Sequence, residues 1–88
     1  MPKDAKDFVD FIVKAMVEKP ELVKIVKVSK QGDNVALGTE SSMVLLEIHV
    51  DESDLGKVIG KSGRTIKSIR SIVNLLFKDR NLFVDIAK

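Results

Sequence analysis

The sequence predicts one α+β domain over residues 1–88, with its elements in the order α-β-β-α-α-β. Two neighbouring segments have the β-branched residues and the two-residue alternation of strands, so they can form an antiparallel hairpin. Two helical segments then separate the second predicted strand from the third, which is enough chain for a parallel crossover. We therefore expect a three-stranded mixed sheet with three helices packed on one face.

Residues 4–19 are predicted to form the first helix, which Asp4 caps and Pro20 ends. Apolar residues recur there at helical spacing: Phe8, Phe11, Ile12, Ala15 and Met16. A second apolar row widens this stripe: Val9, Val13 and Val17. The second row could belong to the core or to a subunit contact, and we expect the core.

Residues 22–30 and 43–50 are predicted to form the first two strands. Alternate residues of the second strand should face the core: Val44, Leu46, Ile48 and Val50. His49 lies on the opposite face and should be an exposed residue with no special role. The intervening residues 31–42 are polar and contain glycine, which predicts a long hairpin connection.

Residues 51–59 should form a short helix that Asp51 or Ser53 caps and that Gly60 ends in a left-handed conformation. Residues 64–78 have the clearest helical period in the chain. The residues expected to be buried in this helix are Ile66, Ile69, Val73 and Leu76. Its expected solvated residues are Arg64, Lys67, Ser71, Asn74 and Lys78. The last predicted strand begins at Leu82.

The residue composition excludes several kinds of site. The chain contains no cysteine and one histidine, so it offers no disulfide, thiolate metal site or histidine cluster, and we expect no cofactor. Charged residues interrupt the apolar residues near the N-terminus, unlike a signal peptide. The longest apolar run is far shorter than the ~20 residues that span a bilayer. We therefore expect no membrane association and a cytoplasmic location.

Charge is distributed unevenly along the chain. Residues 1–56 contain 7 basic and 11 acidic side chains, whereas residues 57–88 contain 8 basic and 2 acidic ones. Within residues 57–70 there are five cations and no anion: Lys57, Lys61, Arg64, Lys67 and Arg70. This patch indicates an anionic partner, although a solvated helix face would have the same composition.

The segment GKVIGKSGRTI, residues 56–66, first invites comparison with a nucleotide-binding P-loop. The P-loop signature has four residues between its first glycine and Gly-Lys-Ser, but only three separate Gly56 from Gly60. A P-loop also follows a strand directly, whereas a predicted helix start intervenes here. We therefore do not expect ATP binding.

The same residues suit another phosphate ligand if Gly60-Lys61-Ser62-Gly63 forms a bend between two helices. Gly60 and Gly63 permit a sharp turn and a close approach to a ligand. Free N–H groups at the start of the next helix would face a phosphodiester backbone, and Lys61 would add positive charge. Apolar side chains beside the bend would contact splayed bases, as in single-stranded nucleic-acid recognition.

The segment VIGKSGRTI, within the longer stretch DLGKVIGKSGRTIKSIRSIV, resembles the core motif of KH domains, in which a Gly-x-x-G loop joins two helices. The predicted element order resembles the bacterial type II KH arrangement, and the similarity covers nearly the whole chain. The chain is similar to the small bacterial single-KH-domain RNA-binding proteins of the KhpA type. Residues 31–42 are long for this compact family and depart from its pattern.

The resemblance implies that the chain binds single-stranded RNA with low sequence specificity, as an RNA chaperone or post-transcriptional regulator. The sugar-phosphate chain would contact Gly60, Lys61, Ser62 and Gly63. Phosphates would also attract Lys57, Arg64, Lys67 and Arg70. The bases would contact Val58, Ile59 and Ile66. For Val58 and Ile66 a core position is an equal alternative, and Arg70 could be an ordinary surface residue.

The binding loop lacks aromatic residues, since none occurs between residues 12 and 76. It therefore cannot stack bases on rings, as other modules do. One such domain holds about four nucleotides, so useful affinity would need a second site. The resemblance implies a homodimer and a larger KH-containing partner of the KhpB or Jag type. Spare apolar positions, such as Ile72 and Leu75 or those on the first helix, are candidate contacts.

A protein-interaction module with the KH shape and no significant RNA affinity is the alternative function. An enzyme is the least expected class, because the chain has no cysteine nucleophile and no carboxylate pair near the loop. The choice between RNA and single-stranded DNA stays open at this stage.

Overall fold

The structure is a computed structural model that describes residues 2–31, 42–78 and 81–87. The elements run in the order α1 (Ala5–Met16), β1 (Lys24–Gln31), β2 (Ser42–His49), α2 (Leu55–Ile59), α3 (Arg64–Phe77) and β3 (Leu82–Ile86). Short 3-10 turns lie at Pro20–Leu22, Glu52–Asp54 and Lys61–Gly63. Across the described ranges, this order confirms the predicted α-β-β-α-α-β arrangement.

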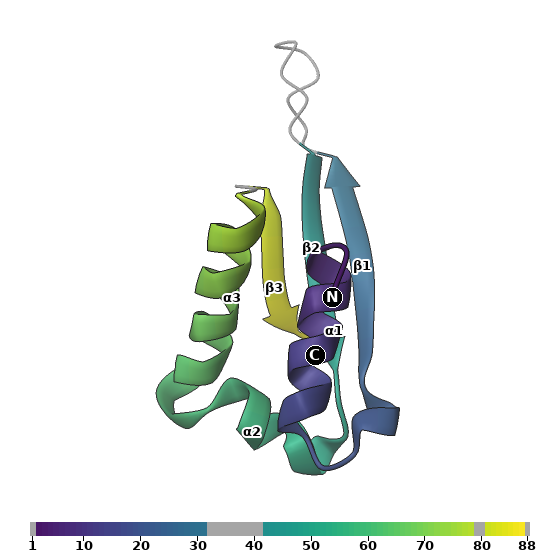
Figure 1. The fold of residues 1–88 in the computed structure, drawn as a ribbon, viewed down its shortest axis with the longest axis vertical. Helices are drawn as coiled ribbons and strands as arrows, with labels where there is room; N and C mark the ends of the chain where they lie inside the picture. Colours follow the sequence, from purple (N-terminus) through teal and green to yellow (C-terminus); the bar gives the residue numbers. More distant parts are fainter. Residues whose placement is uncertain (1, 32–41, 79–80, 88) are drawn as a thin grey trace.

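The described strands form a mixed sheet in the order β1-β2-β3. β1 pairs antiparallel with β2, with Ile25 opposite Ile48, and β2 pairs parallel with β3, with Leu46 opposite Val84. The parallel pairing arises because α2 and α3 return the chain to the end of the sheet where β2 begins (Figure 1). α1 and α3 lie side by side against the sheet, and α2 lies at the end where β2 finishes (Figure 1).

The core lies between the sheet and these helices. Side chains from every one of the six main elements are less than a tenth exposed: Val9, Val13, Ile25, Leu46, Ile48, Val58, Ile66, Ile69, Val73, Leu82 and Val84. Burying an aliphatic side chain of this kind contributes about 1.5–3 kcal/mol. The predicted core positions Leu46 and Ile48 are confirmed, and Val44 and Val50 pack half-buried at the core margin.

The buried face of α1 is not centred on the apolar stripe that its sequence predicts. Val9 and Val13, from the second apolar row, are completely buried, so their expected core position is confirmed. Phe11 is 63% exposed and Ala15 is also exposed, so their assignment to the buried stripe was wrong. Apolar residues cover so wide an arc of this helix that their spacing alone does not define its buried centre. Asp4 caps the first turn, as predicted.

The C-terminal end of α1 lies at Met16, before the predicted end at residue 19. The N–H groups of Glu18 and Lys19 donate to the carboxyl oxygens of Asp54, each at 3.1 Å, instead of to helical carbonyls. Pro20 also disfavours helical geometry at the residue before it. The helix therefore ends where the carboxylate of Asp54, distant in the sequence, accepts the N–H groups that would otherwise continue it.

The strands differ slightly from their predicted limits. β1 begins at Lys24 rather than at residue 22, because a 3-10 turn occupies Pro20–Leu22. His49 closes β2 and is exposed, as expected. Residues 32–41, most of the long connection predicted for 31–42, lie outside the described residues.

α3 confirms three of its four predicted core residues. Ile66, Ile69 and Val73 are buried, but Leu76 is 58% exposed, so its prediction was wrong. The next core position falls four residues after Val73, at Phe77, which packs edge-on against Phe8 with ring centroids 6.0 Å apart. A step of four keeps this side chain on the buried face of a 3.6-residue helix.

Candidate nucleic-acid interface

Three residues with positive φ build the bend between α2 and α3. Gly60 ends α2 with φ 75° and ψ 171°, while Ser62 and Gly63 adopt left-handed conformations with φ 56° and 71°. Gly60 therefore ends the short helix as predicted, but its ψ lies outside the left-handed helical region expected for it. Ser62 is strained, since a non-glycine residue in this conformation costs roughly 1–2 kcal/mol. Strain of this kind clusters at ligand sites.

The two glycines of the bend are required for different reasons. A Cβ at Gly60 would lie 2.1 Å from Oγ1 and 2.9 Å from the backbone nitrogen of Thr65, in the first turn of α3. A Cβ at Gly63 would meet no atom within 4 Å, so only its φ favours glycine. Gly60 thus lets the loop pack against α3, and Gly63 lets the chain turn into it.

Two backbone amides of the bend have no intramolecular partner among the described residues. The N–H of Gly60 bonds back into α2, and the N–H of Gly63 donates to the carbonyl of Gly60 at 3.1 Å. The N–H groups of Lys61 and Ser62, which lie between them, make no such bond to the described part of the chain. Both residues are exposed, so a ligand can reach this part of the bend. Unpaired N–H groups at an accessible bend suit phosphate oxygens.

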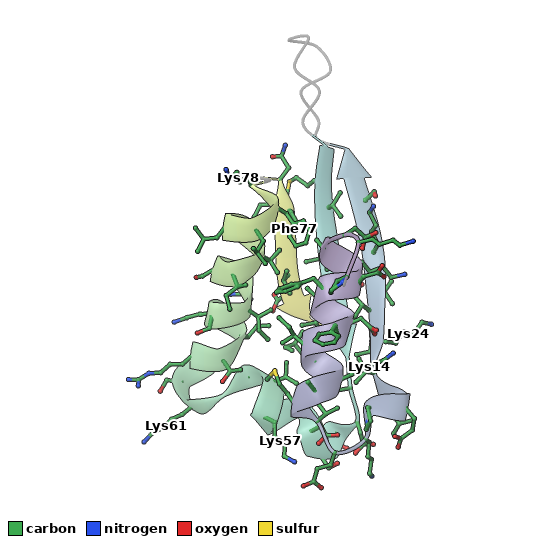
Figure 2. All side chains as sticks on the ribbon, viewed as in Figure 1. Lys14, Lys24, Lys57, Lys61, Phe77 and Lys78 are labelled. Carbon is green, nitrogen blue, oxygen red and sulfur yellow. The ribbon has the colours of Figure 1, made fainter. Side chains whose placement is uncertain are left out.

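Three of the five predicted cations lie exposed on the bend and on the start of α3: Lys61, Arg64 and Lys67. In the described ranges, none of them forms a salt bridge. Figure 2 shows Lys61 projecting from the bend away from the body of the molecule. The free cations of the predicted basic patch therefore lie beside the two unpaired amides.

Lys57 and Arg70, the other two predicted cations, are engaged within the protein. The ammonium of Lys57 lies 2.9 Å from Oε1 of Glu18 and 3.8 Å from Oδ1 of Asp54. The guanidinium of Arg70 donates to the carbonyl of Val84 at 2.6 Å and to the carboxylate of Asp85 at 2.9 Å. The structure thus separates five cations that look equivalent in the sequence into a free group and a bound group.

The predicted base-contacting residues also separate. Val58 is 0% exposed and Ile66 is 6% exposed, so both lie in the core, the alternative that the sequence left open for them. Ile59 is 37% exposed and is the one of the three that presents apolar surface. Nothing lies within 4 Å of a Cβ built at Gly56, one turn before Gly60, so this side of α2 is open to a flat ligand.

Asp54 is a buried acidic residue whose role the sequence did not indicate. Asp54 is 1% exposed, and its carboxylate accepts the two amide bonds that end α1, while Lys57 lies beside it. It therefore ties α1 to the start of α2 and helps to fix the helix that leads into the bend. No local pattern in the sequence signals this role, because the two amides lie 36 and 35 residues away from Asp54.

Asp51 caps the turn that precedes Asp54. Its carboxylate accepts the N–H of Ser53 at 3.1 Å, which confirms Asp51 as one of the two predicted caps. The hydroxyl and the amide of Ser53 hold the pKa of Asp51 below its usual value, with a smaller contribution from Lys19. The cap is thus ionised at neutral pH.

The element order, the mixed sheet and the Gly-x-x-G bend between two helices define a type II KH domain, a class of nucleic-acid-binding domain. The family model described as "KhpA/KhpB, KH domain" matches residues 6–86. The chain belongs to this family. KH domains bind ligands and are not enzymes, so the family confirms the expected non-enzymatic class.

Several relatives carry the name "RNA-binding protein KhpA". The Clostridium perfringens protein is 44% identical over 68 residues, which cover 77% of each chain. The Chlamydia caviae protein is 37% identical over 81 residues, which cover 92% of this chain and 91% of the relative. The Thermotoga maritima protein is 35% identical over 74 residues, or 84% and 85% of the two chains. No solved structure matches this chain significantly.

Proposed function

We propose that this chain, acting as a single KH domain, binds single-stranded RNA at the bend Gly60–Gly63 and along the first turns of α3. The observation that carries the proposal lies within the described ranges. There, the amides of the exposed residues Lys61 and Ser62 have no intramolecular partner, and Lys61, Arg64 and Lys67 form no salt bridge. RNA is proposed over single-stranded DNA because the relatives are named RNA-binding proteins.

The bend would hold the sugar-phosphate chain. The amides of Lys61 and Ser62 donate to phosphate oxygens, and the ammonium of Lys61 adds a charge-assisted contact. Arg64 and Lys67 lie three and six residues further along, so they follow roughly the same side of α3 and can meet the next phosphates. Contacts to phosphate carry no base information, which accounts for the low sequence specificity proposed here.

Bases would lie over the open side of α2. Ile59 offers apolar surface, and Gly56 leaves room for a base to approach the helix backbone. Val58 and Ile66 support this surface from the core rather than contacting bases themselves. With one exposed aliphatic side chain and no ring, the apolar contribution to binding is small, and a single domain binds weakly.

The test replaces Lys61 and Ser62 together by aspartate and measures binding of a fluorescent single-stranded RNA by anisotropy. Two carboxylates at the phosphate contact should weaken binding at least about tenfold. Aspartate tolerates the left-handed conformation of Ser62, so the fold should survive, as circular dichroism can verify.

The matched control is Lys24→Asp with Ser29→Asp, which changes the net charge equally at exposed positions of β1. Lys24 lies on the opposite side of the molecule from Lys61 (Figure 2). This control should bind nearly as well as the wild type. An equal loss of RNA affinity in both double variants would mean that only the net charge matters. Unchanged affinity in the Lys61 and Ser62 double variant would mean that the bend does not contact RNA. Absence of RNA binding by the wild type would favour the protein-interaction module.

We also propose a homodimer, with a larger KhpB-type KH protein as a further partner, in the cytoplasm. The outer face of α3 supports this proposal, because Ile72, Leu75 and Leu76 are 42%, 74% and 58% exposed. A second site in a dimer would raise the effective concentration of a weak one. No helix in the described ranges is long and apolar enough to cross a bilayer.

If the homodimer forms through the outer face of α3, Leu75→Asp should halve the mass measured by sedimentation. An unchanged mass would exclude this face as the dimer interface.

A further inference from the structure

The two outer strands of the described sheet differ in how they are protected from other strands. An unpaired edge can add a strand from another molecule, and lysines along the edge commonly prevent this. β1 contains Lys24, Lys27 and Lys30, whereas β3, with the sequence LFVDI, contains one charged residue, Asp85. An exposed strand edge with few charged residues can pair with a strand of another molecule. β3 therefore needs protection other than lysines of its own.

The backbone groups on the free edge of β3 are those of its even-numbered residues. The carbonyl of Asn81 accepts a bond from β2, and the N–H of Ala87 donates one to β2. Because successive residues of a strand point to opposite sides, the N–H and C=O groups of Leu82, Val84 and Ile86 face away from β2. These are the groups that an added strand would use.

A side chain from α3 and a side chain from β3 occupy two of these edge groups. Nε of Arg70 donates to the carbonyl of Val84 at 2.6 Å, and Nη2 donates to Oδ1 of Asp85 at 2.9 Å. The same carboxylate oxygen accepts the N–H of Ile86 at 2.8 Å. The two residues thus close the C-terminal half of the edge with three connected hydrogen bonds.

An apolar surface adjoins this edge on the face of the sheet opposite the core. Phe83 is 45% exposed and stands opposite the half-buried Leu45 of β2, while Met43 is 42% exposed nearby. If the edge were open, pairing of two β3 strands would also bury these side chains. The hydrophobic effect would then favour association.

We propose that Arg70 and Asp85 cap the free edge of β3 and keep it from pairing with β3 of a second copy. This assigns Arg70 to control of self-association rather than to phosphate binding. It also distinguishes Arg70 from Lys67, one turn earlier on the same helix, which has no salt bridge in the described ranges. The proposal does not depend on RNA binding.

The test measures the mass of Arg70→Ala by sedimentation over a series of protein concentrations, without RNA. With the edge open on every copy, the mass should rise with concentration to about twice that of the wild type or more. Arg70→Lys keeps the charge but not the two-pronged geometry, so it should associate as well. Lys67→Ala, which removes the same charge, should keep the wild-type mass. Adding Phe83→Lys to Arg70→Ala should restore it, because lysine blocks an edge.

Two further measurements test the edge cap if the mass of a variant is altered by poor folding. In Asp85→Ala, the amide of Ile86 loses its acceptor, so its hydrogen exchange should be faster by about tenfold. RNA affinity of Arg70→Ala should stay within about twofold of the wild type, whereas Lys67→Ala should lose affinity. Wild-type mass for both Arg70 variants, or equal growth in Lys67→Ala, would overturn the edge cap. Loss of RNA affinity in Arg70→Ala would mean that Arg70 belongs to the RNA-binding surface.

Discussion

At the scale of single residues, the binding bend depends on two glycines that have different physical tasks. Gly60 leaves no room for a methyl group against Thr65, whereas Gly63 has space and only a positive φ. The sequence predicts both glycines as parts of one Gly-x-x-G motif, in which they have the same role. Their difference depends on a contact with α3 that no local pattern encodes.

Gly60→Ala and Gly63→Ala should therefore differ in thermal and urea denaturation. Gly63→Ala should cost roughly 1–2 kcal/mol, the price of one left-handed non-glycine residue. Gly60→Ala should cost more and displace the bend, since backbone atoms of Thr65 must move. Similar losses of stability and of RNA affinity in the two variants would contradict this account.

At the residue scale, the sequence also does not show which cations form ion pairs. Lys57 and Lys61 are both lysines beside the motif, yet only Lys57 has Glu18 within 2.9 Å. Glu18 lies on a segment nearly forty residues away in the sequence, just after α1. A local charge count predicts a basic patch but cannot predict which of its members distant acids neutralise.

At the scale of elements, the order of helices and strands and most buried faces follow from periodicity, and the C-terminal end of α1 does not. α3 has a narrow apolar stripe and was placed nearly correctly, whereas the wide stripe of α1 left its rotation undefined. α1 ends early because Asp54 captures the amides of Glu18 and Lys19. This contact joins elements that are separate in the sequence.

Asp54→Ala should destabilise the domain by roughly 2–4 kcal/mol, because it leaves two amide donors of the α1 end without their acceptor and Lys57 with one fewer carboxylate. Urea denaturation measures the loss. Asp51→Ala, on the exposed cap of the same turn, is the matched control and should cost only about 1 kcal/mol. A loss at Asp54 no larger than that at Asp51 would mean that the buried contact does not hold α1 to α2.

At the scale of the whole molecule, the proposed RNA-binding cations lie apart from two exposed apolar surfaces. Lys61, Arg64 and Lys67 lie at the bend and the first turns of α3. The two apolar surfaces are the outer part of α3, with Ile72, Leu75 and Leu76, and the open face of the sheet, with Met43 and Phe83. A nucleic acid and a protein partner can therefore bind without competing for one surface. The sequence predicted a basic half of the chain, but this separation follows from the topology.

The salt dependence of RNA binding tests how many cations act. If Lys61, Arg64 and Lys67 each meet one phosphate, log K should fall against log salt with a slope of about −2, at ~0.7 per phosphate on a single strand. Participation of all five cations would steepen it to about −3.5. Removing Lys67 should lower the slope by about 0.7, and removing Lys57 should leave it unchanged. A flat response would refute phosphate contacts altogether.

The most direct test of the binding bend is a titration of the ¹⁵N-labelled protein with a short single-stranded RNA, followed through its backbone amide signals. The account predicts that the largest shifts occur at Lys61 and Ser62, with smaller ones at Arg64 and Lys67, and that the amides of β1 stay unmoved. Saturable binding that leaves the signals of Lys61 and Ser62 in place would contradict it.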